Sequence, residues 1–151
     1  MSLLARKVAR FHSMQVPLKK DFLQDNWLFK NMDNLYKDSH SKFQIDHLIN
    51  QFNLETFKNN NLMNEINWVK KTAVNSNSPI IFCHNDVRNS NILFREEDCD
   101  EDNKLVFCDF EWSAYGWRGF DLAHLFSEWQ RNEFNIGIPL IPSDQQIQWF
   151  L

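Results

Sequence analysis

The stretch IIFCHNDVRNSNILF, residues 80–94, decides how the rest of the chain is interpreted. An apolar run ends in the polar group His-Asn-Asp, and a second apolar run opens at Asn91, five positions after Asp86. A third run follows in KLVFCDFEW, residues 104–112. Short apolar runs rich in β-branched and aromatic residues, bounded by polar clusters, predict strands. We therefore expect three short strands, over residues 80–83, 91–94 and 104–108.

Helical periodicity surrounds these strands. Apolar residues recur at intervals of three and four positions on both sides, which is typical of amphipathic helices. The expected helices cover residues 2–14, 21–38, 43–54, 55–74 and 121–129, with a last one beginning at Ser143 or Asp144. The acidic stretch 95–103 is interpreted as a solvated hairpin tip. No repeat or long flexible linker divides the chain, so the sequence predicts one α+β domain that is mostly helical.

Composition excludes several classes of protein. The 151 residues include 43% hydrophobic and 24% charged residues, which argues against disorder along the whole chain. A net charge of −4 without a basic cluster argues against nucleic-acid binding. No apolar stretch reaches the length of a membrane span, and no signal peptide is recognisable, so we expect a cytoplasmic protein without membrane insertion.

The cysteines and glycines limit the chemistry further. Three cysteines without repeated spacing predict neither a disulfide framework nor a zinc site. Three glycines are too few and too scattered to form a loop that cradles phosphates.

The polar residues at the strand ends fit phosphoryl transfer from ATP. That reaction needs an acceptor hydroxyl held in line and metal ions that neutralise phosphate charge. In kinases a loop Asp orients the hydroxyl, an Asn five residues later supports a metal, and an Asp after a later strand binds metal. Asp86, Asn91 and Asp109 occupy these positions in order. Each is weak alone, and the simplest interpretation of His84 is a buried histidine bonded to neighbouring backbone.

Two longer motifs resemble those of choline/ethanolamine kinases. The first is Phe82-Cys83-His84-Asn85-Asp86 followed by Asn91-Ile92-Leu93. The second runs DFEWSAYGWRGFDLAHLFSEW over residues 109–129. Earlier segments, 8–12 and 27–29, are also similar to that family. Asp109-Phe110 and Arg118-Gly119-Phe120 favour the choline branch over the ethanolamine branch.

The resemblance implies a protein-kinase-like fold, of the choline kinase and aminoglycoside phosphotransferase type, with this chain forming mainly the large lobe. It implies Asp86 as catalytic base, Asn91, Asp109 and Glu111 as Mg²⁺ ligands, and ATP as co-substrate. His84 and Asp121 are expected to support the catalytic loop. A helix N-cap is the alternative for Asp121.

The amino alcohol is expected to bind through aromatic faces and a carboxylate. A quaternary ammonium has no N–H to donate and is held by aromatic rings and nearby negative charge. The resemblance places Glu128 near this site, with a surface carboxylate as the alternative. Candidate aromatic faces are supplied by Trp112, Tyr115, Trp117 and Trp129, with core aromatics as the alternative. Trp112 and the sequence Tyr115-Gly116-Trp117 depart from the family's usual residues, which leaves the details of substrate binding open.

The expected activity is ATP-dependent phosphorylation of choline, and by the same chemistry ethanolamine, as the first step of phospholipid synthesis. The chain is expected to be a fragment that lacks the small ATP-binding lobe and the last helices, and a homodimer is compatible with the family. Two alternatives remain: an inactive form that binds a full-length kinase, and an ethanolamine-specific kinase. An antibiotic or small-sugar phosphotransferase would share Asp86, Asn91 and Asp109 but not the motif over residues 118–129.

Overall fold

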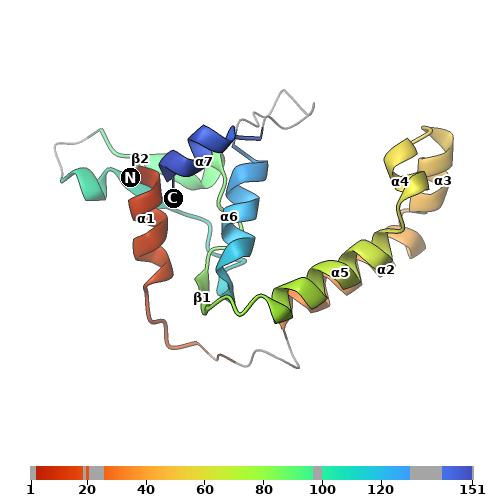
Figure 1. Cartoon of the computed structure of the whole chain (residues 1–151), viewed down its shortest axis with the longest axis horizontal. Coiled ribbons are helices and arrows are strands. Elements are labelled where there is room, and N and C mark those ends of the chain that lie inside the picture. Colours follow the sequence, from red (N-terminus) through yellow and green to blue (C-terminus); the bar gives the residue numbers. More distant parts are fainter. Residues whose placement is uncertain (1–2, 19, 21–25, 97–99, 130–140, 151) are drawn as a thin grey trace. The chain divides into compact units, whose positions relative to one another are not determined.

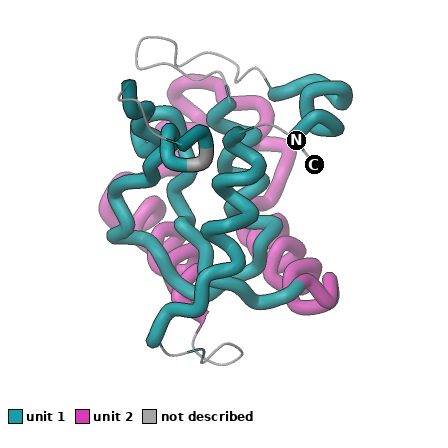
Figure 2. Tube along the Cα trace, turned by 90° about the vertical axis from the view of Figure 1, so that its left-hand side faces the viewer, with its two compact units in different colours: residues 1–20, 79–151 teal, residues 21–78 magenta. Residues whose placement is uncertain are grey.

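The computed structural model describes residues 3–18, 20, 26–96, 100–129 and 141–150. It contains two compact units, residues 1–20 with 79–151 and residues 21–78 (Figure 2). The sequence alone predicted no such division. The first unit carries all the candidate site residues.

Two antiparallel strand pairs organise the first unit. β1 (Ile80–Cys83) pairs with β4 (Ala114–Trp117), and β2 (Ile92–Phe94) pairs with β3 (Leu105–Phe107). The three predicted strands are confirmed with ends that differ by at most one residue. β4 was missed, because a short segment containing Gly116 has little strand character until β1 supplies its hydrogen-bonding partner. Single helical turns, Asn89–Asn91 and Glu101–Asn103, lie in the connections.

Three α-helices complete the first unit (Figure 1). They are α1 (Leu3–His12), α6 (Arg118–Ser127) and α7 (Asp144–Phe150), and each was predicted apart from its exact ends. α1 buries Ala5, Val8 and Phe11, spaced three residues apart. The Phe11 ring lies 5.3 Å from Phe82 and 5.6 Å from Phe107, measured between ring centroids. Helix α1 therefore packs on both strand pairs at once, through a single aromatic side chain.

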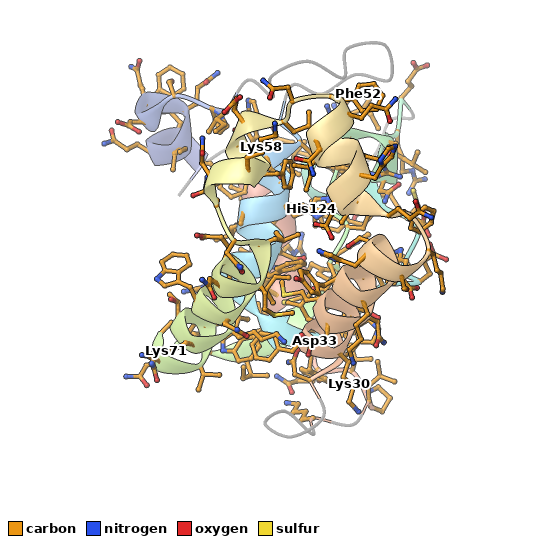
Figure 3. The ribbon with its side chains drawn as sticks, turned by 90° about the vertical axis from the view of Figure 1, so that its right-hand side faces the viewer. Lys30, Asp33, Phe52, Lys58, Lys71 and His124 are labelled. Carbon is orange, nitrogen blue, oxygen red and sulfur yellow. The ribbon has the colours of Figure 1, made fainter. Side chains whose placement is uncertain are left out.

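The second unit is entirely helical in its described residues. It consists of α2 (Trp27–Ser41), α3 (Ile45–Gln51), α4 (Glu55–Asn59) and α5 (Leu62–Asn75). The single helix predicted over residues 55–74 is wrong, because Asn60 adopts an extended backbone and the Asn61 side chain caps α5 by accepting from the backbone N–H of Asn64. The Lys70 ammonium on α5 donates a hydrogen bond to the Asp33 carboxylate on α2. Asp33 is labelled in Figure 3. The start of the predicted helix 21–38 lies outside the described residues.

Among the described residues, no helix is both long enough and apolar enough to cross a lipid bilayer.

Candidate active site

The connection between β1 and β2, residues 84–91, brings Asp86 and Asn91 into direct contact. We call it the 84–91 loop. The Asn91 amide nitrogen donates to a carboxylate oxygen of Asp86 at 2.7 Å and to the Asp86 carbonyl at 3.0 Å. A carboxylate accepts and cannot donate, so the amide must turn its nitrogen towards Asp86 and its oxygen away. Asn91 is buried, and its side chain therefore fixes both the backbone and the carboxylate of Asp86.

Two cationic or potentially cationic side chains also face Asp86. His124 Nε2, from α6, lies 3.3 Å from one carboxylate oxygen, and Arg88 Nε lies 3.4 Å from the other. The three neighbours come from the middle and the end of the 84–91 loop and from a helix more than thirty residues along the chain. Asp86 is thus held in one orientation while its side chain keeps 16% of its surface exposed.

The segment that carries Asp109 is joined to both ends of the 84–91 loop. The backbone N–H of Cys108 donates to the Asn91 carbonyl at 3.1 Å, and His84 Nε2 donates to the Cys108 carbonyl at 3.0 Å. On the other side of Asp109, the Phe110 ring stacks on Phe11 at 5.9 Å. Asp109 is therefore anchored through both of its neighbours, next to Asn91.

Further hydrogen bonds connect the two segments. The Asn85 side chain donates to the Trp112 carbonyl at 2.8 Å, and the Ser113 hydroxyl donates to the His84 carbonyl at 3.3 Å. Asn85 and Asp109 both have left-handed backbones, with φ of 64° and 65°. Non-glycine residues in this region are uncommon and are frequent at functional sites, where surrounding contacts hold them.

Asp121 supports the 84–91 loop from α6. Its two carboxylate oxygens accept the backbone N–H groups of His84 at 2.9 Å and Asn85 at 2.6 Å. Trp117, and not Asp121, occupies the N-cap position of α6, so the N-cap alternative is wrong. The His84 side chain is fully buried and bonds backbone, in agreement with the simplest interpretation of this residue.

The residues expected to hold Mg²⁺ are suited to it by donor type. Asp109 and Glu111 are exposed, and neither carboxylate joins a hydrogen bond or ion pair among the described residues. The Asn91 amide oxygen points away from Asp86 and accepts from the Ser90 hydroxyl at 3.2 Å. Mg²⁺ prefers oxygen ligands and is usually bound through one or two carboxylates with water and phosphate. These three oxygen donors fit that requirement.

The residues expected to bind substrate occupy different surroundings. Trp112 is exposed, beside the Asn85 contact. Tyr115 is buried, its hydroxyl donates to the Val16 carbonyl at 2.9 Å, and Lys20 lies 4.6 Å from its ring centroid. Trp129 packs against Phe126 and Phe150, and Glu128 is half-buried at the end of α6. Of these three aromatic residues, Trp112 is the most exposed.

A buried group behind the loop was not predicted from the sequence. His12 Nε2 lies 2.9 Å from an Asp121 carboxylate oxygen, and Cys83 lies close to both residues. Burial raises the pKa of the Cys83 thiol far above its ordinary value, and the negative charge of Asp121 adds to the rise. The roles of His12, Arg88 and His124 were also missed, since a lone histidine or arginine carries no signal in the sequence.

Comparison with known proteins identifies a consistent set of relatives. The sequence profile of the choline/ethanolamine kinase family matches residues 1–151. A choline/ethanolamine kinase of Mus musculus is 38% identical over 130 residues, which cover 83% of this chain and 30% of that protein. A probable ethanolamine kinase of Arabidopsis thaliana is 27% identical over 148 residues, covering 98% of this chain and 37% of that protein. The chain thus spans about a third of the length of these relatives.

Among solved structures, an ethanolamine kinase of Plasmodium vivax superimposes with a TM-score of 0.61 at 22% identity. The superposition covers 98% of this chain and 42% of that structure. The likeness supports the kinase-like fold predicted from the sequence.

Proposed function

The chain belongs to the choline/ethanolamine kinase family, and from that membership we propose that the full-length protein transfers the γ-phosphoryl group of ATP to the hydroxyl of choline or ethanolamine. The observation that carries the proposal is the contact between Asn91 and Asp86, within the 84–91 loop that is hydrogen-bonded to the segment of Asp109. It supports the proposal because phosphoryl transfer to an alcohol requires a fixed carboxylate together with oxygen donors for a metal ion.

In this proposal Asp86 is the catalytic base. Its carboxylate accepts the hydrogen bond of the acceptor hydroxyl, aligns its oxygen with the phosphorus and takes the proton as the new P–O bond forms. Asn91 holds the carboxylate in place, and His124 and Arg88 limit its other rotations. Without these partners the Asp86 side chain would rotate among several orientations, and only some of them would align the acceptor hydroxyl with the phosphorus.

Asn91, Asp109 and Glu111 hold Mg²⁺ in this proposal. Bound Mg²⁺ supplies neutralisation of the charge on the phosphate oxygens. The exposed carboxylates of Asp109 and Glu111 are available for this role, and the left-handed backbone at Asp109 is fixed by its neighbours Cys108 and Phe110.

For the amino alcohol we propose Trp112, Tyr115, Trp129 and Glu128. Trp112 is the residue best placed for direct contact, because it is 44% exposed and its carbonyl is bonded to the 84–91 loop. Tyr115 and Trp129 then shape the site through packing. Both reactants are small and water-soluble, so we also propose that the reaction takes place in the cytosol.

The test is a kinase assay on the full-length protein with ATP, Mg²⁺ and either choline or ethanolamine, with the phosphorylated product identified by mass spectrometry. Asp86→Asn is expected to lower kcat by about 100- to 10,000-fold. Asp144→Asn, at an exposed aspartate of α7, is the matched control and should leave kcat unchanged. Turnover on the two alcohols, compared side by side, assigns the preferred substrate.

If neither alcohol is phosphorylated by the full-length protein, the proposal is wrong. Co-purification with an active kinase of the same family would then favour the non-catalytic alternative.

A further inference from the structure

The carboxylate of Asp121 has a third hydrogen-bonding partner besides the 84–91 loop. His12, the last residue of α1, places its Nε2 2.9 Å from the same oxygen that accepts from the His84 N–H. The His12 side chain is 7% exposed and that of Asp121 is 1% exposed. A buried carboxylate is costly unless hydrogen bonds satisfy it, so each of these three donors matters to its placement.

The orientation of His12 follows from its partner. Because a carboxylate only accepts, Nε2 must carry the hydrogen that points at Asp121. The helix that carries His12 is itself fixed, since the neighbouring Phe11 packs on Phe82, Phe107 and Phe110. His12 therefore donates to Asp121 from a rigid position, across a separation of 109 residues in the chain.

We propose that His12 is a positioning residue, which sets the rotation of the Asp121 carboxylate so that its two oxygens meet the backbone N–H groups of His84 and Asn85. Asn85 has the left-handed backbone that immediately precedes Asp86, and its N–H makes the shortest of these bonds, 2.6 Å. Loss of the His12 donor would free the carboxylate to rotate, and the backbone before Asp86 would lose the contacts that hold its strained conformation. The effect on catalysis, but not the contact itself, rests on the proposed role of Asp86.

A metal site at His12, Cys83 and Asp121 is the competing interpretation, since their ligand atoms all lie within 4.8 Å of one another. The hydrogen bonds argue against it. His12 Nε2 points its N–H at Asp121, so a metal could bind this nitrogen only after that proton is lost and the hydrogen bond is broken. Burial raises the pKa of the Cys83 thiol, so metal binding would also have to remove a proton that this position retains.

The test compares three variants of the full-length protein. His12→Leu keeps the side-chain volume and removes the donor, while His12→Gln keeps a donor at similar reach. His47→Leu, at an exposed histidine of α3, is the control. Hydrogen exchange measures how often the amides of His84 and Asn85 open, and it does so without any reference to activity.

His12→Leu is expected to speed exchange at the amides of residues 84 and 85 by about 10- to 100-fold, as loss of a hydrogen bond to a charged group implies. In the kinase assay kcat should fall by a similar factor with KM for both substrates within about twofold, because His12 touches neither substrate. His12→Gln should restore most of both quantities, and His47→Leu should change neither.

Unchanged amide exchange at residues 84 and 85 in His12→Leu would overturn the inference. Equal changes in exchange and kcat in His12→Gln and His12→Leu would also overturn it, because they would show that His12 acts through packing and not through its hydrogen bond to Asp121. Zinc titration distinguishes the competing site, because tight binding by the parent that is lost in His12→Gln would also overturn the inference. If exchange responds as expected while Asp86→Asn retains full activity, the proposed function fails and the positioning contact stands.

Discussion

Replacing Asn91 by alanine tests whether the contact with Asp86 organises the site. The substitution removes one hydrogen bond to a carboxylate, at 2.7 Å, and one to a carbonyl, at 3.0 Å. Such bonds contribute about 1.5–3 and about 0.5–1.5 kcal/mol, so their sum is about 2–4.5 kcal/mol. At about 1.4 kcal/mol for each tenfold change in rate, the full loss corresponds to a decrease in kcat/KM of about 30- to 2,000-fold.

Asp86 keeps two partners in this variant, His124 and Arg88, so its carboxylate is not left without support. We therefore expect the lower part of the range, a decrease of about 30- to 200-fold. The assay is kcat/KM of the full-length protein at limiting amino alcohol, with folding checked by circular dichroism. Asn89→Ala, an exposed position in the same helical turn, is the matched control and should stay within about twofold of the parent.

Asn91→Asp separates the two roles given to this residue. The carboxylate keeps an oxygen for Mg²⁺, but it cannot donate to Asp86 and adds a like charge beside it. We expect it to be at least as impaired as Asn91→Ala. A kcat/KM within threefold of the parent in Asn91→Ala would refute the claim that Asn91 organises the site. Full activity in Asn91→Asp would show that the hydrogen bond to Asp86 is not needed and that Asn91 acts only as an oxygen ligand for the metal.

Three further predictions concern stability. Above a pH of about 9, the free energy of unfolding should fall by about 1.4 kcal/mol per pH unit because of Cys83. The raised pKa keeps the Cys83 thiol protonated in the folded protein, whereas the thiol of the unfolded chain ionises. Urea titrations at several pH values measure this slope, and Cys83→Ala should make it shallower by the same amount. Phe11→Ala should lower the free energy of unfolding by about 3–5 kcal/mol, because its buried ring packs on both strand pairs. Phe94→Ala is the control: this residue is 62% exposed, and the substitution should lower the free energy of unfolding by less than about 1 kcal/mol. Equal losses in the two variants would contradict the packing described for Phe11. Gly119→Ala should raise the free energy of unfolding by about 0.5–1 kcal/mol, because alanine favours the helix more than glycine does. The added Cβ meets no atom within 4 Å, so it causes no clash. A lower melting temperature in Gly119→Ala would contradict the prediction.

Local patterns predicted most of the fold because most elements show their apolar periodicity in their own sequence. The strand Ile80–Cys83 was predicted with its exact limits from a four-residue apolar run. The predicted helix over residues 55–74 failed at its start: the apolar pattern begins only at Leu62, and Asn61 in the asparagine run 59–61 caps a separate helix there. β4 depends on pairing with β1, which is a long-range contact that no local pattern reveals.

The candidate site divides in the same way. The spacing of Asp86 and Asn91 predicted two residues that the loop brings into contact. His12 and His124 reach the site from helices far away in the sequence, and only the packing of α1 and α6 on β1 brings them there. The two-unit division was not predicted, because the loop composition of residues 75–79 was interpreted as a connection within one domain.

The left-handed backbones at Asn85 and Asp109 have a consequence for gene duplicates of this protein. Under the proposed metal-binding role of Asp109, a copy released from selection for catalysis would not need this carboxylate, but its chain would still have to make the same turn to fold. Glycine and asparagine tolerate that turn at little cost, whereas alanine, valine and other common mutational products do not. A decayed but still folded paralogue should therefore be recognisable by Gly or Asn at this position, in place of the mixture of residues that neutral drift leaves elsewhere on the surface.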